Sequence, residues 1–227
     1  MLKCVMFDMD GTIADTEPLC LAAFQAALAV TGGRDFTKAE ITSTYGPSEE
    51  GCLKALVGDR AGEGLKIYLE YYRAHHRRLC PAPFPGLLEV FDLVEARGAA
   101  LALITGKSAA SLALDLAAFG LEKRFRITKT GRPEGADKPA DMRAVLQELG
   151  LASEEAVYIG DAPTDITSAR VAGVSIWAAA WAPGADRDRL RSLGPDRLCL
   201  TLAELAGCLL ETLPPPGLDK YGRGRLL

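Results

Sequence analysis

The sequence predicts an α/β protein whose parallel sheet is interrupted, after its first strand, by an all-helical insert. Two observations lead to this fold class. From about residue 86 onward, short apolar runs of strand length alternate with helical stretches of about ten residues, the pattern of βαβ units. Residues 16–82 instead show helical patterns without a convincing strand. With 227 residues, 48% of them hydrophobic, the chain is long enough to bury a sizeable core.

The first strand is expected at residues 2–7, where Lys3 is the one charged residue. A short and strongly apolar run suits a strand buried on both faces. The insert then begins with a helix rich in Ala and Leu, which two consecutive glycines stop. Three prolines close the insert before the α/β pattern resumes. Helices are expected within it at residues 17–30, 38–43, 49–57 and 64–79.

The remaining elements follow in alternation, with glycines ending most of the helices. A capping box, Thr201 to Glu204, opens a last helix. We therefore expect a Rossmann-like core formed by residues 1–15 and 83–212, a helical cap of residues 16–82, and a C-terminal tail of residues 213–227. Helices are expected at 86–97, 108–119, 139–149 and 165–172, and strands at 99–104, 124–128, 156–159 and 174–178.

Composition excludes several classes of protein. The net charge is −4, which argues against nucleic acid as a partner. The longest apolar run, residues 18–31, is too short to span a bilayer, so no membrane association is expected. Six cysteines without a C-x-x-C pair, and no apparent leader, predict reduced thiols and a cytoplasmic location. The two histidines, His75 and His76, are expected on a solvated helix face, which argues against a zinc hydrolase.

Polar residues follow the strands of the predicted sheet. Because ligands bind beyond the carboxyl ends of parallel strands, these residues are expected to converge. Acids without His or Cys offer hard oxygen ligands, which suit Mg²⁺. In chain order the residues are Asp8 and Asp10, then Thr105, Gly106 and Lys107, then Lys138, then Asp161 and Asp165.

The spacing of the two first acids suggests their chemistry. Asp8 and Asp10 are two residues apart, and side chains at this spacing in a strand point to the same face. A cation and a lysine would relieve their repulsion, leaving one carboxylate free to attack phosphorus and the other to transfer protons. Thr105 and Lys138 would complete the cradle around a phosphoryl group.

These residues resemble the four motifs of the haloacid dehalogenase superfamily, especially its helical-cap phosphatase branch, which includes phosphoglycolate phosphatases and β-phosphoglucomutases. The motifs here are Asp8-Met9-Asp10-Gly11-Thr12, Thr105, Lys138 and the run from Gly160 to Asp165. The resemblance implies that Asp8 is the nucleophile and a Mg²⁺ ligand. It implies that Asp10 is the acid/base, with its backbone carbonyl also on the metal. Phosphate would be bound by Thr105, Gly106 and Lys138. Mg²⁺ would also be bound by Asp161 and, directly or through water, by Asp165. The alternative for Asp165 is an acid in the first turn of a helix, which the helix dipole favours.

The chain departs from the common pattern of its relatives at three positions. Gly106 stands where Asn is frequent, Asp141 where a second Pro is frequent, and Ala162 where Ser or Thr is frequent. None of these changes removes a catalytic group. They affect the fine contacts to the substrate, and the reaction class is unchanged.

The expected function is hydrolysis of a small phosphorylated metabolite by a Mg²⁺-dependent phosphatase, through an aspartyl phosphate. The alternatives are a β-phosphoglucomutase-like mutase and a non-enzymatic phosphometabolite-binding module. Cys20 stands where the mutases carry His, and Glu49 about where they carry a cation for a second phosphate, which favours the phosphatase. Gly46, Ser48 and Glu49 are expected to form a substrate loop of the cap, although Glu49 could equally be a solvated charge. Sugar phosphates, phosphoglycolate, nucleotides and pyrophosphate all stay open as substrates, as do monomer and homodimer.

Overall fold

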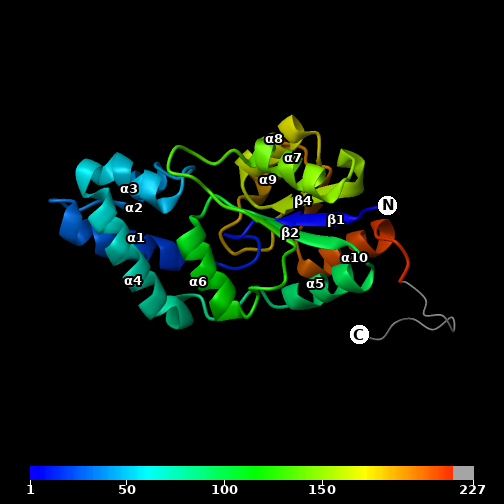
Figure 1. Ribbon diagram of the computed structural model, residues 1–227, viewed down its shortest axis with the longest axis horizontal. Coiled ribbons are helices and arrows are strands. Elements are labelled where there is room, and N and C mark those ends of the chain that lie inside the picture. Colours follow the sequence, from blue (N-terminus) through cyan, green and yellow to red (C-terminus); the bar gives the residue numbers. More distant parts are fainter. Residues whose placement is uncertain (217–227) are drawn as a thin grey trace.

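The computed structural model describes residues 1–216, so residues 217–227 of the predicted tail lie outside the described part. Six parallel strands form one sheet in the order β3-β2-β1-β4-β5-β6 (Figure 1). The predicted α/β class with a helical insertion after β1 is confirmed. The strands are β1 (Cys4–Phe7), β2 (Ala100–Ile104), β3 (Ile127–Lys129), β4 (Ala156–Gly160), β5 (Ser175–Ala179) and β6 (Arg197–Cys199).

Helices cover both faces of the sheet, which explains why its central strands are apolar throughout. Cys4 and Met6 of β1 belong to the core beneath α7 and α8, whereas Val5 and Phe7 belong to the core on the side of α5 and α10. The core helices are α5 (Leu87–Ala96), α6 (Ala109–Phe119), α7 (Lys138–Leu149), α8 (Pro163–Ala172), α9 (Arg187–Ser192) and α10 (Leu202–Thr212), with a short 3₁₀ turn, η2 (Ser153–Glu155), before β4.

The helical insert lies at the end of the molecule toward which the strands run (Figure 1). Its longest helix, α4, places Tyr68, Tyr72 and His76 four residues apart on one buried face. That face packs against α1 within the insert and against α6 of the core. The insert consists of α1 (Glu17–Thr31), α2 (Lys38–Thr42), α3 (Glu49–Val57), η1 (Gly58–Arg60) and α4 (Ala61–Leu79).

The structure corrects three expectations. The strand expected at 124–128 is β3, Ile127–Lys129, and α9 and β6 were not predicted. β6 has only three residues and owes its strand conformation to pairing with β5, which the local sequence does not encode. The solvated face expected for His76 is wrong, because α6 covers it. No described helix is long and apolar enough to cross a bilayer.

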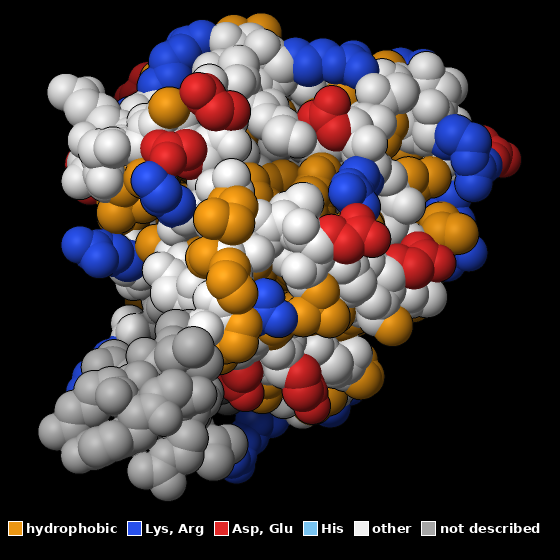
Figure 2. All heavy atoms as spheres, turned by 90° about the vertical axis from the view of Figure 1, so that its right-hand side faces the viewer, with side chains coloured by type: hydrophobic (Ala, Val, Ile, Leu, Met, Phe, Trp, Pro, Cys, Tyr) orange, Lys and Arg blue, Asp and Glu red, His pale blue; other side chains and the backbone are white. Residues whose placement is uncertain are grey.

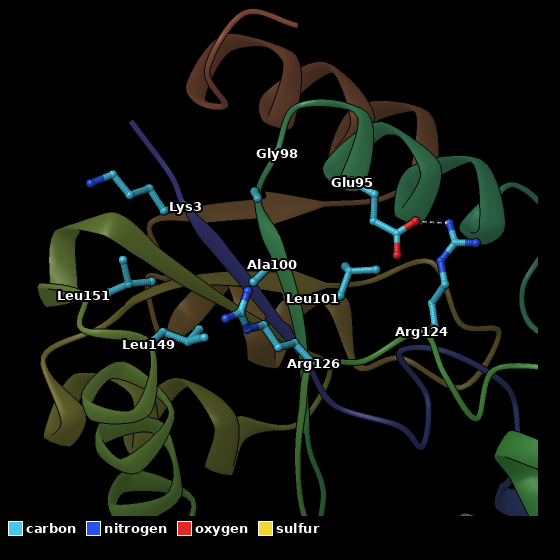
Figure 3. Close-up of a pocket in the computed structure, with 10 residues that line it drawn as sticks. Lys3, Glu95, Gly98, Ala100, Leu101, Arg124, Arg126, Leu149 and Leu151 are labelled. Atoms are coloured by element: carbon cyan, nitrogen blue, oxygen red, sulfur yellow. Dashed lines mark ion pairs between the residues drawn. The ribbon is translucent and has the colours of Figure 1, made fainter. Parts of the chain in front are cut away.

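The amino ends of the strands form the opposite end of the molecule, which Figure 2 views directly. Basic, acidic and hydrophobic side chains are interspersed there. A hollow of about 380 Å³ lies at this end beside β2 (Figure 3). Two of its three cations, Lys3 and Arg124, are paired with Glu155 and Glu95, at 2.6 and 3.1 Å. The third cation, Arg126, forms no ion pair with another described residue, so the hollow is weakly basic, in contrast to the acidic cluster at the other end.

Candidate active site

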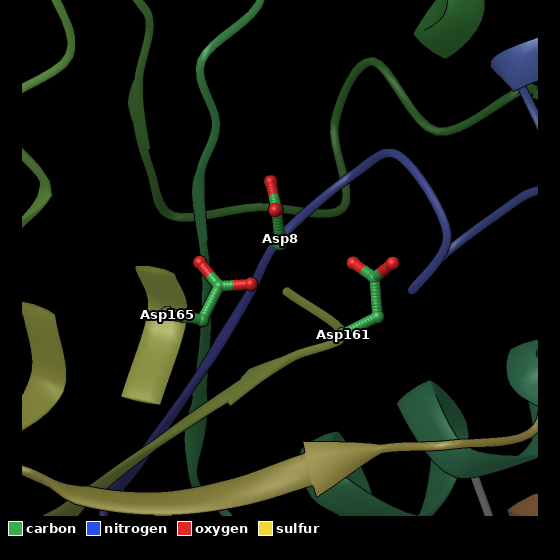
Figure 4. Close-up of side chains that lie close together, drawn as sticks. All are labelled: Asp8, Asp161 and Asp165. Carbon is green, nitrogen blue, oxygen red and sulfur yellow. The ribbon is translucent and has the colours of Figure 1, made fainter. Parts of the chain in front are cut away.

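Three carboxyl groups meet at the carboxyl ends of the central strands (Figure 4). Asp8 directly follows β1, Asp161 directly follows β4, and Asp165 lies in the first turn of α8. One oxygen from each lies within 4.8 Å of the others. The convergence follows from the sheet, because β1 and β4 are neighbours and pair in register up to Phe7 and Ile159.

Asp8 is held in one orientation by two donors. The Met9 amide donates to Oδ1 at 2.7 Å, and Lys138 Nζ donates to Oδ2 at 2.7 Å. Burial raises the pKa of Asp8 to about 6, although the Lys138 ammonium acts in the opposite direction. The carboxylate is thus desolvated and oriented, as a nucleophile requires.

Asp165 serves both the helix and the cluster. Its Oδ2 accepts the Ala162 amide at 3.0 Å, which caps the start of α8. Its Oδ1 accepts from Lys138 Nζ at 2.6 Å and from the Tyr158 hydroxyl at 3.2 Å. The interpretation of Asp165 as only an acid in the first turn of a helix therefore accounts for the contact of Oδ2 but not for those of Oδ1.

The cluster carries more negative charge than its lysine can balance. Burial raises the pKa of Asp161 well above its usual value, and the nearby Asp8 raises it further. Asp161 accepts one hydrogen bond from the Thr12 hydroxyl, at 3.2 Å. Three acids that share the single ammonium of Lys138 leave room for a cation, and an all-oxygen donor set suits Mg²⁺.

Gly11 is required by the close packing of this cluster. Its φ is +71°, and a β-carbon there would lie 2.1 Å from Oδ2 of Asp161. Both the backbone conformation and the contact exclude any larger residue. The turn after β1 therefore depends on a glycine between the two loops that carry the acids.

Asp10 points elsewhere. Its carboxylate is not part of the three-acid cluster but accepts hydrogen bonds from the Thr16 hydroxyl and from Lys107 Nζ, the latter at 3.1 Å. The side chain is 40% exposed and lines the cavity described below. The structure thus separates the carboxyl groups of Asp8 and Asp10, which the alternation of a strand had predicted to point the same way.

Lys107 is a site residue to which the sequence analysis assigned no role. Its ammonium is buried and contacts Asp10, the Tyr72 hydroxyl at 3.1 Å and Oδ2 of Asp115 at 3.4 Å. Asp115 also accepts from the Tyr72 hydroxyl at 2.7 Å and from His76 Nε2 at 2.9 Å. Burial opposes the charge on Lys107, but the carboxylates outweigh it and hold the pKa of the ammonium well above its usual value.

One signal for this network was present in the sequence. Asp115 is the only charged residue in the otherwise apolar sequence of α6, AASLALDLAAF. A single acid in a helix that packs on both sides needs a partner. Its partners, however, come from α4 in the insert and from the loop after β2, and sequence spacing does not identify them.

The predicted phosphate-binding residues take different places. Thr105 is buried, and its hydroxyl accepts from the Lys107 amide at 3.3 Å, which shapes the loop after β2. Gly106 and Lys138 line the cavity. A β-carbon at Gly106 would lie 3.6 Å from the carbonyl oxygen of Gly46, so the insert approaches the core closely at this point.

The loop before α3 is fastened to the core. Glu49 is buried, and its carboxylate accepts from the Ser108 amide at 2.8 Å and from the Ser111 hydroxyl. The Ser48 amide donates to the Arg132 carbonyl at 3.0 Å. The alternative of a solvated Glu49 is therefore wrong, because the start of α6 covers it. Gly46 and Glu49 line the cavity, and Ser48 is buried behind it.

A cavity of about 770 Å³ lies between the acidic cluster and the insert. Asp8, Asp10 and Asp161 line its core side, and Phe24, Tyr45 and other insert residues line the opposite side. Its volume falls within the range of about 300–1,000 Å³ that is typical of small-molecule sites. A small ligand that contacts the acids is therefore enclosed by both parts of the chain.

Comparison with known proteins agrees with this geometry. Residues 5–179 match the model of the family described as haloacid dehalogenase-like hydrolase. Pyrophosphatase PpaX of Bacillus pumilus is 28% identical over 182 residues, which cover 79% of this chain and 84% of that protein. Phosphoglycolate phosphatase of Rhodospirillum rubrum is 28% identical, with 98% and 96% covered.

A crystal structure of a predicted phosphoglycolate phosphatase from Haemophilus somnus superposes with a TM-score of 0.77 at 19% identity, covering 91% of this chain and 97% of that one. At this identity the likeness shows the fold, and the match over residues 5–179 shows the family. The chain belongs to the haloacid dehalogenase-like hydrolases, in the branch with a helical cap that is related to PpaX and the phosphoglycolate phosphatases.

Proposed function

We propose that this hydrolase is a Mg²⁺-dependent phosphatase of a small phosphomonoester and that it works through an aspartyl phosphate on Asp8. The observation that carries the proposal is the cluster of Asp8, Asp161 and Asp165 with Lys138. An oriented carboxylate, an ammonium and a place for a cation are the parts that phosphoryl transfer needs. The names of the relatives, pyrophosphatase and phosphoglycolate phosphatase, support the same reaction class.

The metal would be held by the carboxylates of Asp8, Asp161 and Asp165 and by the backbone carbonyl of Asp10. When bound, Mg²⁺ supplies positive charge for the phosphoryl oxygens and offsets the repulsion between them and the acids. Lys138 contributes further positive charge from the side of α7, since its ammonium already bridges Asp8 and Asp165. The amides around Gly106 border the same space.

In the first step an oxygen of Asp8 forms a bond to phosphorus while the bond from phosphorus to the leaving oxygen breaks. Asp10 gives its proton to that leaving oxygen. In the second step Asp10 takes a proton from water, which attacks the aspartyl phosphate and releases phosphate with Asp8 restored. For this role the Asp10 carboxylate exchanges its Thr16 and Lys107 partners for the substrate and the water.

The mutase alternative is less well supported. Such an enzyme would need a cation in the cap for a second phosphate, and the corresponding place is occupied by Glu49. Its carboxylate is engaged by Ser108 and Ser111, so a phosphate there would displace a buried contact and meet a like charge. A pure binding module would have no use for the proton-transfer group Asp10.

The test is release of phosphate from a panel of phosphorylated metabolites, with Mg²⁺ or with EDTA. We expect Mg²⁺-dependent release by the wild-type chain and loss of essentially all turnover in Asp8→Asn. Asp188→Asn is the matched control, because its side chain is 95% exposed on α9, far along the chain from the cluster. Turnover by Asp8→Asn at the level of this control would refute the proposal.

A further inference from the structure

The insert presents an aromatic wall to the cavity. Tyr45 is 43% exposed and lies against Phe24, with ring centroids 6.0 Å apart and an interplanar angle of 35°. Phe24 packs in turn on Tyr68 at 4.8 Å, and both are buried. All three rings line the cavity. Tyr45 thus offers a free ring surface that buried aromatic rings support from behind, an arrangement suited to stacking with a planar ring.

The charges that line the cavity as a whole do not favour a second anion. Six acidic side chains and three lysines line the cavity. Of these lysines, Lys138 is engaged by the acidic cluster, and Lys107 lies between Asp10 and Asp115. Lys38, on the insert, is paired with Glu17 at 2.8 Å. Once the phosphoryl group occupies the metal end, a second negative group on the leaving side would therefore face acids and paired cations.

The polar groups that remain on the wall are neutral. Burial raises the pKa of the Cys20 thiol to about 12 and of the Cys52 thiol to about 11, so neither is ionised near neutral pH. The Tyr68 hydroxyl is buried and has no hydrogen-bond partner among the described residues. None of these groups offers a positive charge to an anionic leaving group.

We propose, as a refinement that rests on the phosphatase function, that the leaving group of the substrate is uncharged and carries a planar aromatic ring. Nucleoside 5′-monophosphates belong to this chemical class. The phosphoryl group would lie at the Asp8 end, and the ring would stack on Tyr45. The carboxylate of phosphoglycolate and the second phosphoryl group of pyrophosphate find no free cation on this wall.

Four substrates distinguish the effect of the ring from the effect of the charge. Uridine 5′-monophosphate and ribose 5-phosphate share the same primary leaving oxygen and differ by the base, and phosphoglycolate adds a carboxylate instead. We expect kcat/KM for uridine 5′-monophosphate to exceed that for ribose 5-phosphate by about tenfold or more, as stacking of one base on an aromatic side chain allows. Phosphoglycolate and pyrophosphate should rank below ribose 5-phosphate. If phosphoglycolate or pyrophosphate is turned over as fast as uridine 5′-monophosphate, or faster, the leaving-group proposal is overturned. The phosphatase function would still stand.

The variant Tyr45→Ala tests the ring contact directly. It should lower kcat/KM for uridine 5′-monophosphate about tenfold and lower kcat/KM for ribose 5-phosphate by a smaller factor. Val30→Ala is the control, because Val30 is a 54% exposed apolar residue of α1 outside the cavity. An equal loss for both substrates in Tyr45→Ala would overturn the stacking role.

A binding measurement keeps this proposal separate from the reaction. In Asp8→Asn with Mg²⁺, calorimetry should show uridine 5′-monophosphate binding more tightly than phosphoglycolate, and Tyr45→Ala added to that variant should remove the difference. The same preference without turnover in the wild type would refute the phosphatase function alone. Tighter binding of phosphoglycolate would refute the leaving-group assignment alone.

Discussion

The two sides of the cavity are built from different kinds of contact. On the core side, the three acids and Lys138 directly follow strands or lie at the start of helices, so their positions derive from the parallel sheet itself. On the insert side, the rings and paired charges come from helices and from the loop that carries Tyr45, whose sequence is not part of that pattern. The positions of the proposed reacting groups therefore follow from the common fold, whereas the proposed selectivity would depend on residues particular to the insert.

The largest effect is expected where the two sides meet. Lys107→Met removes the ammonium that Asp10 and buried Asp115 share, which leaves Asp115 with an uncompensated charge. We expect the free energy of unfolding to fall by about 3–5 kcal/mol, the usual cost of breaking a buried ion pair. Lys38→Met is the control, since its pair with Glu17 is exposed and contributes at most about 1 kcal/mol. Urea denaturation of both variants checks this, and equal losses would contradict the buried network.

We expect the affinity of the acidic cluster for Mg²⁺ to depend on pH, whereas the contacts on the insert side should not. The folded-state pKa of Asp8, about 6, lies above its ordinary 3.8, so the fold favours the protonated form. In the metal-free chain this contribution to stability is complete below about pH 4 and is lost as the pH rises through about 6. Because Mg²⁺ needs the ionised carboxylate, its affinity should increase about tenfold between pH 5 and pH 7.

Calorimetric titration with Mg²⁺ across this range checks the prediction. In Asp8→Asn the increase should be smaller, because only the raised pKa of Asp161 then remains in the cluster. An affinity that stays constant between pH 5 and pH 7 in the wild type would show that Asp8 is not at the metal.

The smallest effect concerns the charge of the insert. Glu17→Gln leaves Lys38 without its partner, so the lysine becomes available to an anionic leaving group. We expect kcat/KM for phosphoglycolate to rise by a factor of about two to five, since an exposed pair is worth up to about 1 kcal/mol. Ribose 5-phosphate should be unaffected. An equal change in kcat/KM for phosphoglycolate and ribose 5-phosphate would show that Lys38 does not distinguish a charged leaving group from an uncharged one.

The sequence predicted which residues gather on the core side of the cavity, because their positions follow from the ends of neighbouring strands and helices. Asp8, Lys138, Asp161 and Asp165 each lie just beyond a strand or at the start of a helix, and a parallel sheet brings those points together. The direction of the Asp10 carboxylate was not predictable, because it depends on a contact with Lys107 in the loop after β2.

On the insert side, sequence patterns did not predict which residues contact one another. Asp115 meets Tyr72 and His76 through the packing of α4 on α6, and these residues are about forty positions apart in the chain. Glu49 likewise finds its partners, Ser108 and Ser111, only when the insert closes on the core. Contacts between the insert and the core produce no periodic pattern in the sequence, so only the structure reveals them.

Capture of the reaction intermediate is the direct test of an aspartyl phosphate on Asp8. The wild-type chain is mixed rapidly with Mg²⁺ and substrate and quenched in acid, and its peptides are examined by mass spectrometry. We expect one added phosphoryl group on the peptide that contains Asp8, and none with EDTA or in Asp8→Asn. Phosphate release without that modification, or with the phosphoryl group on another residue, would contradict it.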